Sequence, residues 1–435
     1  MPADTAARWA HLRPQRADLL ATPTAPRSAI TSGLVFTPLP LTAPTLTVRV
    51  YDVGAGAGTH RDVRTSIPAA GVRALAASRA DGLLAVLEAV GGSEVAVRVH
   101  LLDLAGAAHP AAAAPVLEAR VRVPDAEGLE YTLHHAQGAV QAHISASETG
   151  LASPLWAWRP GLLSTPGLAA GGFDAAGVYR PTPAAVRPLS ATSFVATFQP
   201  AHDGTGEGYA AACADELELV IDAVAVLSLH VPERPGWLSY PDLNAQQQLR
   251  VTLFDDQPDF RLAPHVSGGM LVLEGNMGVT HHVGVLPLAS IPSQHEPATL
   301  DDVPGVEWVS LPGCAGAAGV SAPRVAVCCS DEAGHTLYVG DYGPGAGADA
   351  APPPPVPLVL GALPGFKVGP SAQGLVPLPD NGDPLRAYAS RYSCRSAWVR
   401  AHIDWGADDV DVDWVELDDA AVYLGTTLGI VVLSF

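Results

Sequence analysis

Short apolar segments of strand length recur along the whole chain, and turn residues separate them. Leu46–Val53 alternates between apolar and polar positions, as a half-buried strand does. Leu83–Ala89 and Val95–Leu104 flank Gly91-Gly92-Ser93, which indicates a tight hairpin. Helical periodicity is confined to the short segment Thr5–His11. The other segments that we expect to form strands are Val72–Ala77, Val116–Val123, Leu129–His135, Ala139–Ser145, Pro154–Arg159, Ser193–Phe198, Gly208–Ala214, Glu216–Ile221, Leu249–Phe254, Gly269–Glu274, His281–Leu288, Val306–Leu311, Arg324–Ser330, Thr336–Asp341, Leu385–Tyr392, Ala397–Ile403, Asp413–Leu417, Ala421–Gly425 and Ile430–Phe435.

These segments form groups of three or four that recur at intervals of roughly 45–60 residues, which is the repeat length of propeller blades. A β-sandwich has roughly 7–9 strands per domain, so this chain would need several sandwiches with linkers between them. Gly343–Pro357 lacks an apolar pattern and is expected to be an exposed loop rather than a domain boundary. We therefore predict an all-β fold, a single β-propeller of about seven blades (six to eight allowed), over residues 17–435. Residues 1–16 are predicted to form a short irregular or helical N-terminal segment.

The end of the chain carries two apolar runs rich in β-branched residues, Ala421–Leu424 and Ile430–Phe435. Leu428 and Gly429 lie in the turn between them. Because the first and last blades of a propeller meet, we expect this hairpin to pair with an N-terminal strand. The candidates for that strand are Asp18–Ala21 and Leu34–Thr37.

Charge and composition restrict the classes of partner. The chain has 24 Lys and Arg against 44 Asp and Glu, which gives a formal net charge of −20. Phosphate groups bind to basic surfaces, so we expect neither nucleic acid nor an anionic membrane as a partner. No apolar run approaches the ~18 residues that span a bilayer.

The cysteines and the first residues indicate a compartment. The opening MPADTAARWAHLRPQRADLL lacks the apolar core of a secretory signal, so we do not expect export. Five cysteines without a C-x-x-C motif indicate reduced thiols in the cytoplasm or nucleus, and neither a disulfide framework nor a zinc site. They are Cys213, Cys314, Cys328, Cys329 and Cys394.

Two motifs are similar to ligand-binding loops but lack the spacing. Gly54–Thr59 follows a strand as a dinucleotide-binding loop does, but glycine is missing at its last position and no helix follows. We expect a surface loop there and no cofactor.

Asp409, Asp411 and Asp413 resemble the start of a calcium loop, but the glycine and glutamate of an EF-hand are missing. Their period-two spacing predicts an acidic face of an extended segment, with a weak divalent-cation site as the alternative.

Histidines occur in two adjacent pairs, His134-His135 and His281-His282. Neighbours in a strand point to opposite faces, so neither pair can chelate one ion. We expect ordinary surface or half-buried histidines and no metal site at either pair.

Candidate nucleophiles and acids also lack a supporting pattern. In Cys328-Cys329 we expect one thiol to point into a blade and the other outward, and neither has a nearby histidine. Ser267 lies in HVSGG, which misses the first glycine of G-x-S-x-G. The carboxylate pairs lie among turn residues and are expected to cap turns rather than to act as acid and base; they are Asp255-Asp256 and Asp301-Asp302.

Tryptophans are common at protein interfaces and also in cores. We expect each of them to fill space between blades, with partner contact as the alternative. The tryptophans considered are Trp156, Trp158, Trp237, Trp308, Trp398, Trp405 and Trp414.

Several segments together resemble a known family, the fungal F-box proteins with a degenerate, WD40-like C-terminal β-propeller. The resemblance covers nearly the whole chain. The F-box, a helical module of about 45 residues in that family, is missing here, because only eight residues precede Trp9. The segments that carry the resemblance are Ala7–Pro14, Asp81–Leu87, Val99–Leu102, Pro154–Gly161, Val306–Gly313, Glu416–Asp419 and Tyr423–Phe435.

The resemblance implies a substrate-recruiting propeller of a ubiquitin ligase system, or a free-standing scaffold propeller that binds an unknown protein. Without an F-box, the chain is not expected to bind the ligase adaptor. We predict no catalytic, cofactor-binding or metal-binding residue, and the partner-binding residues are not identified by the sequence. The alternative is a propeller enzyme of hydrolase or lyase type with its site in the central channel.

Overall fold

The computed structural model describes the β-strands and many of the turns that connect them. The described residues are 9, 12, 14, 16–20, 28–39, 42–54, 59–79, 82–90, 95–103, 117–121, 129–136, 139–146, 155–159, 162–164, 172–173, 179–180, 183–188, 193–198, 220–229, 243–252, 263–277, 279–291, 298–299, 302–316, 318–331, 334–342, 367–368, 372–373, 397–405 and 410–435. Among them, no helix is long and apolar enough to cross a membrane.

The first half of the chain forms four antiparallel sheets and one small hairpin. They are the β2–β5 sheet with β2 (Ala29–Thr31), β3 (Leu34–Pro38), β4 (Thr45–Asp52) and β5 (His60–Pro68); the β6–β9 sheet with β6 (Val72–Ser78), β7 (Leu83–Val90), β8 (Val95–Asp103) and β9 (Leu117–Val121); the β10–β13 sheet with β10 (Leu129–Ala136), β11 (Ala139–Ala146), β12 (Leu155–Arg159) and β13 (Leu162–Ser164); the hairpin of β14 (Gly172–Phe173) and β15 (Tyr179–Arg180); and the β16–β19 sheet with β16 (Pro183–Pro188), β17 (Ser193–Phe198), β18 (Val220–Leu229) and β19 (Leu243–Thr252).

The second half forms three more sheets, and the last of them includes the first strand of the chain. They are the β20–β24 sheet with β20 (Ala263–Ser267), β21 (Met270–Met277), β22 (Thr280–Pro287) and β24 (Glu307–Pro312); the β25–β31 sheet with β25 (Cys314–Ala315), β26 (Gly319–Ser321), β27 (Arg324–Asp331), β28 (Gly334–Asp341), β29 (Lys367–Val368), β30 (Ala372–Gln373) and β31 (Ala397–Asp404); and the terminal sheet with β32 (Val412–Leu417), β33 (Ala421–Thr426), β34 (Gly429–Ser434) and β1 (Arg16–Leu20). The two-residue β23 (Ala298–Thr299) pairs with β19, and single 3₁₀ turns occur at Ala69–Gly71 and Leu288–Ser290.

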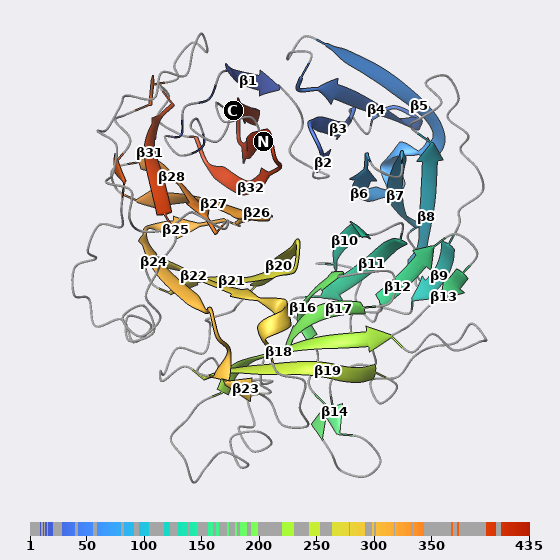
Figure 1. Ribbon diagram of the computed structural model, residues 1–435. Helices are drawn as coiled ribbons and strands as arrows, with labels where there is room; N and C mark the ends of the chain where they lie inside the picture. The colour runs from blue at the N-terminus through green and yellow to red at the C-terminus, as the bar shows by residue number, and fades with distance from the viewer. Residues whose placement is uncertain are drawn as a thin grey trace.

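The sheets follow one another around a common axis (Figure 1). In the β2–β5, β20–β24 and terminal sheets, the strand drawn nearest the centre stands at one end of the sheet, namely β2, β20 or β32 (Figure 1). From there, each strand pairs antiparallel with the next, which lies farther out (Figure 1). This radial arrangement of antiparallel sheets is a β-propeller, so the predicted all-β propeller class is confirmed.

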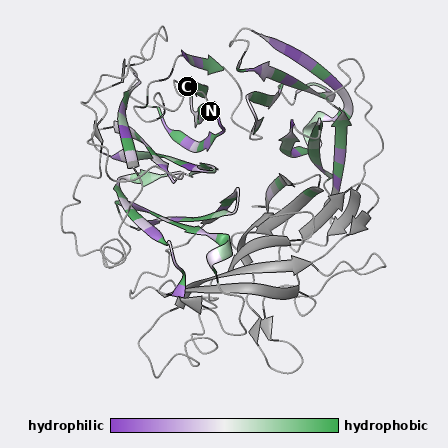
Figure 2. Cartoon of the chain, viewed as in Figure 1, coloured by the Kyte–Doolittle hydropathy of each residue, from purple (hydrophilic) through white to green (hydrophobic). Residues whose placement is uncertain are grey.

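The hydrophobic cores lie between successive sheets. Val272 and Val283 of the β20–β24 sheet pack with Val325 and Val327 of the β25–β31 sheet. Middle strands are therefore covered on both faces, and the burial of β33 is continuous rather than alternating. The outermost strand β5 is mostly exposed and carries more hydrophilic residues (Figure 2).

The N-terminal strand completes the sheet that the end of the chain begins. β1 pairs antiparallel with β34, with Arg16 opposite Ser434 and Leu20 opposite Ile430. The pairing expected for the C-terminal hairpin is therefore present, with the first of the two candidate strands. Trp9 adds a contact beside it, because its ring stacks on Phe435 with centroids 4.1 Å apart.

Hydrogen bonds also tie the turns between first and second strands to the next sheet. The Ser267 hydroxyl accepts from the Ala322 N–H at 3.0 Å. The Arg79 guanidinium donates to the Ser32 carbonyl at 2.6 Å. These turns lie at one end of the sheets, and their contacts join neighbouring sheets there.

Most expected strand segments that the structure describes are strands, and Ser193–Phe198 has the expected bounds. Short innermost strands such as β26 and the polar outermost strand β5 were not expected. Four expected segments lie outside the described residues: the helix at Thr5–His11 apart from Trp9, the strands at Gly208–Ala214 and Leu385–Tyr392, and the loop at Gly343–Pro357.

Candidate functional site

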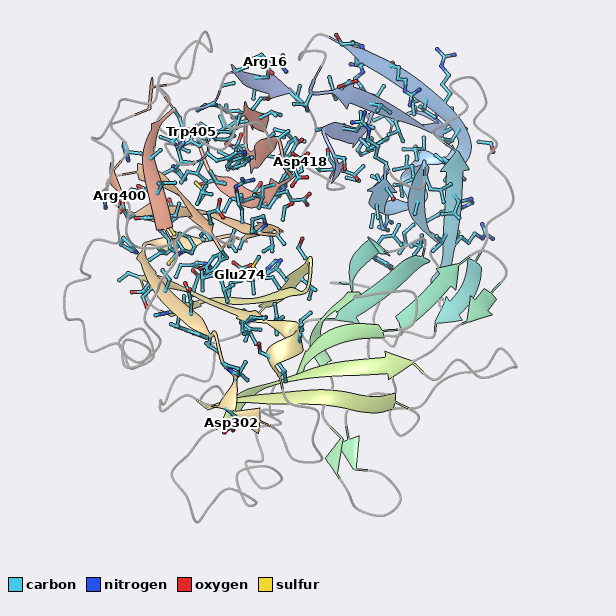
Figure 3. The ribbon with its side chains drawn as sticks, in the orientation of Figure 1. Arg16, Glu274, Asp302, Arg400, Trp405 and Asp418 are labelled. Atoms are coloured by element: carbon cyan, nitrogen blue, oxygen red, sulfur yellow. The ribbon has the colours of Figure 1, made fainter. Side chains whose placement is uncertain are left out.

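A buried carboxylate, Glu274 on β21, lies between the β20–β24 and β25–β31 sheets (Figure 3). His265 on the innermost strand β20 places Nε2 2.6 Å from Oε1, and His281 on β22 places Nε2 3.1 Å from Oε2. The Ala318 N–H of the next sheet donates to both oxygens, at 2.9 and 2.7 Å. One side chain thus joins three strands of its own sheet to the neighbouring sheet.

The electrostatics of this cluster favour the ionised carboxylate. Burial alone would raise the pKa of Glu274, because charge is poorly solvated there. The charge and hydrogen bond of His265 and the hydrogen bond of His281 outweigh burial and hold that pKa well below its usual range. Glu274 is therefore an acceptor, and both histidines donate to it through Nε2.

The Asn276 side chain accepts a hydrogen bond from the second ring nitrogen of His281. The Asn276 amide pairs with the backbone of Ala315: Nδ2 donates to the carbonyl at 2.8 Å, and Oδ1 accepts from the N–H at 3.1 Å. The amide orientation is thus fixed, and Oδ1 faces His281 Nδ1 at 2.8 Å. Because Oδ1 can only accept, the His281 Nδ1–H donates to Asn276, and this bond holds the ring in place against Glu274.

A second buried histidine–carboxylate pair lies in the β6–β9 sheet. His100 on β8 places Nε2 2.8 Å from Glu88 Oε2, and Arg98 lies 3.9 Å from the other oxygen. The pair faces the core shared with the β2–β5 sheet, since Glu88 is opposite Val72 in register. Both carboxylates are therefore held by cationic or histidine donors from their own sheet.

A third acid, Asp418, links the terminal sheet to the first sheet near the axis (Figure 3). Its Oδ2 accepts from the Gly33 N–H at 2.7 Å and from the Tyr423 hydroxyl at 2.8 Å. Its Oδ1 accepts from the Ala420 and Ala421 N–H groups. Burial, followed by the charge of Asp418, raises the pKa of Tyr423, so this hydroxyl remains a donor.

The expected exposure of His281 and His282 is wrong, because both side chains are almost wholly buried. They do point to opposite faces, as expected: His281 contacts Glu274, and His282 lies 3.0 Å from the Ser310 hydroxyl on β24. β22 is covered on both sides by neighbouring sheets, which leaves no outward face. The side chains of His134 and His135 lie outside the described residues.

The expectation that one of the two thiols points outward is also wrong. Cys328 packs in the core between the β25–β31 and terminal sheets, and Cys329 packs in the core toward the β20–β24 sheet. The strand alternates as expected, but each face of a propeller sheet is an interior face. Burial raises the pKa of Cys328 to about 12, so this thiol is inert at neutral pH.

The expected packing role of tryptophan holds for four described residues, Trp308, Trp398, Trp405 and Trp414, which are all buried. Three of them lie across a glycine on the paired strand. The pairs are Trp308 with Gly284, Trp398 with Gly340 and Trp414 with Gly425, and a Cβ at each glycine would collide with the indole. The side chains of Trp156, Trp158 and Trp237 are outside the described part.

In the described part of the chain, the other motifs do not converge on a site. Asp411 and Asp413 are exposed, and Asp409 lies outside the described residues. No group of three or more metal-binding side chains was found in the described part of the chain. Ser267 is used in a turn contact and Asp302 is exposed. Asp255, Asp256 and Asp301 and most of the Gly54–Thr59 loop are outside the description.

Sequence reasoning missed Glu274, His265, Glu88 and His100. A signal was present, because each acid interrupts an otherwise apolar strand, LVLEG in one case and LLAVLEAV in the other. A charge at such a position must find partners when both faces are buried. The partners come from separate strands, so their spacing gives no motif.

Comparison with protein families and with curated proteins gives no match. Solved structures that resemble the chain include Hsv2 from Kluyveromyces lactis (10% identity, 91% of this chain and 86% of that chain covered, TM-score 0.40). Others are the β-propeller domain of the Trilobed protease from Pyrococcus furiosus (10%, 82% and 91%, 0.36) and prolyl oligopeptidase B from Galerina marginata (10%, 76% and 40%, 0.37). These TM-scores are too low to support a conclusion, whereas the radial order of the sheets is itself that of a propeller.

Proposed function

We propose that the chain is one closed ring of seven blades that acts as a non-catalytic protein–protein interaction module. The blades are the seven sheets described above, with the terminal sheet as the blade that the two chain ends share. The pairing of β1 with β34 supports closure, because it joins residues from opposite ends of the sequence in one sheet.

The observation that carries the non-catalytic assignment is the saturation of Glu274. Its two oxygens accept from two histidines and from the Ala318 N–H, so the carboxylate has no site left for a substrate proton. A general acid or base must reach the reacting group itself. This buried cluster of ionisable side chains therefore serves to hold two sheets together.

On the F-box resemblance, we propose that the bound protein is a substrate delivered to a ubiquitin ligase, or a client of a free-standing scaffold in the cytoplasm or nucleus. Neither nucleic acid nor a membrane is a proposed partner, in keeping with the net charge of −20. The proposal concerns the protein that the propeller binds and does not include the ligase adaptor.

Affinity purification followed by reconstitution tests the proposed function. Proteins that copurify with the tagged full chain are purified separately and titrated against it. The proposal expects at least one binary complex with a Kd of about 1 μM or tighter. Two results would contradict it: no reconstituted complex, or turnover of a peptide or ester substrate by the purified chain.

A further inference from the structure

We propose that one end of the propeller binds a basic protein segment that also carries apolar side chains. The surface, called the tip surface below, consists of Val279, Asp331, Asp411 and Leu428. This inference rests on the proposed function and names the binding face and the chemistry of the partner.

The four residues belong to the same end of three successive sheets. Val279 joins β21 to β22, Asp331 ends β27 at its turn to β28, and Leu428 joins β33 to β34. These three residues are at turns between the second and third strands of their sheets, counted from the axis. Asp411 lies in the connection that leads into β32. In a propeller, such turns and the connections between sheets share one face.

Contacts confirm that these turns and connections meet. The Gly313 N–H, in the connection after β24, donates to the Val279 carbonyl at 2.9 Å. The Thr427 N–H, in the β33–β34 turn, donates at 3.2 Å to the carbonyl of Asp411, which precedes β32. Asp411 and Asp331 both act electrostatically on His335 at the start of β28.

Apolar exposure is concentrated at these turns. Among the residues whose side chains the structure describes, the exposed large hydrophobic ones are Val279 at 72%, Leu428 at 45%, Leu19 at 38% and Val90 at 37%. Val90 ends β7 at the corresponding turn of the β6–β9 sheet, so only Leu19, on β1, lies elsewhere. Side chains of this kind cost free energy in water and gain it when a partner covers them.

At the opposite end, the described turns between first and second strands are tied to one another by Asp418 with Gly33, Arg79 with Ser32, and Ser267 with Ala322. Those polar groups are already satisfied within the ring. The two ends therefore differ, and the tip surface is the end that presents uncovered apolar side chains.

Charge complementarity identifies the occupant. Asp331 and Asp411 are exposed at the same end of the sheets as Leu428 and Val279, and the whole chain has an excess of acidic residues. A partner with arginine or lysine beside apolar residues would pair with the carboxylates while it covers Leu428 and Val279. A second copy of this acidic chain, or an anionic surface, would be repelled.

A displayed library of random dodecapeptides, selected against the immobilised full chain, supplies the probe. The enriched peptides are synthesised and titrated by fluorescence anisotropy against the wild type, V279S/L428S and D331N/D411N. L19S/D419N is the matched control, since it removes an exposed apolar and an exposed acidic side chain away from the tip surface. Surface changes of this kind leave stability nearly unchanged, and thermal unfolding checks that.

The enriched peptides are expected to combine basic and apolar residues. Each tip variant should weaken binding by about tenfold or more, salt should weaken it further, and the control should stay within about twofold. Peptides that bind all variants alike, or that are acidic, would overturn the tip surface but leave the proposed function standing. If no peptide binds above a library control without protein, both proposals fail.

Discussion

Trp308 on β24 lies across the backbone of Gly284 on β22, and a Cβ built at Gly284 would stand 2.4 Å from the indole ring. The two residues are register partners on neighbouring strands. The ring thus occupies the space that any other residue at position 284 would need. Comparable pairs in the next two sheets show that close packing of tryptophan on a strand backbone recurs in this part of the propeller.

Gly284→Ala should lower the free energy of unfolding by about 1–3 kcal/mol, because the indole must shift in a filled core. Urea unfolding measures the loss. Gly54→Ala is the control, since its added Cβ meets a flexible carboxylate of Asp52 at 3.3 Å. In a double-mutant cycle with Trp308→Leu, the two effects should not be additive. Additive effects, or no loss in Gly284→Ala, would show that the ring does not fill this space.

Glu274→Gln should destabilise the chain by about 3–5 kcal/mol, the usual loss when one partner of a buried ion pair is removed. The amide carries no negative charge to pair with the histidines and offers one acceptor oxygen where the carboxylate offered two. Chemical denaturation of the variant gives the loss. Asp419→Asn changes an exposed acid and should have little effect. Equal stability of the two variants would show that Glu274 does not help to hold the two sheets together.

The contribution of Glu274 should depend on pH in a defined direction. Its pKa in the folded chain lies below the ordinary value of 4.5, so the unfolded chain takes up the proton first. Glu274 therefore contributes fully to the free energy of unfolding well above pH 4.5. This contribution is lost as the pH falls toward the pKa of Glu274 in the folded chain. The stability gap between the wild type and Glu274→Gln should shrink over that range. A gap that stays constant down to about pH 3 would contradict the lowered pKa.

The thiols should differ in reactivity. Cys314 is exposed, whereas Cys328 and Cys329 are buried. A charged, membrane-impermeant maleimide should label Cys314 in the native chain, and site-resolved mass spectrometry should find Cys328 and Cys329 labelled only after denaturation. Native labelling of Cys328 at a rate similar to that of Cys314 would mean that its side of β27 is open.

The strands could be predicted because their apolar runs are long and their turns carry glycine. Leu83–Ala89 and Ile430–Phe435 are such runs, and both are strands. The three-residue β26 is too short to show a pattern, and the polar β5 has too few buried positions. The burial of His282 and Cys329 could not be predicted from one strand, because it depends on a neighbouring sheet that covers the second face.

The partners of Glu274 could not be predicted from the sequence for a similar reason. Glu274, His281 and Ala318 come from three segments that only the assembled sheets bring together. A charge inside LVLEG was visible in the sequence, but its partners were not. The Asp418 contact with Gly33 is more distant still, since it crosses from the last sheet to the first.

Hydrogen exchange of the β1 and β34 amides tests the central claim, a ring closed by the two ends of the chain, most directly. Five register pairs connect these strands, from Arg16 with Ser434 to Leu20 with Ile430. In a closed ring, peptides that cover Arg16–Leu20 and Gly429–Ser434 should be protected together and exchange only with global unfolding. Rapid exchange of β1 while β34 stays protected would contradict closure.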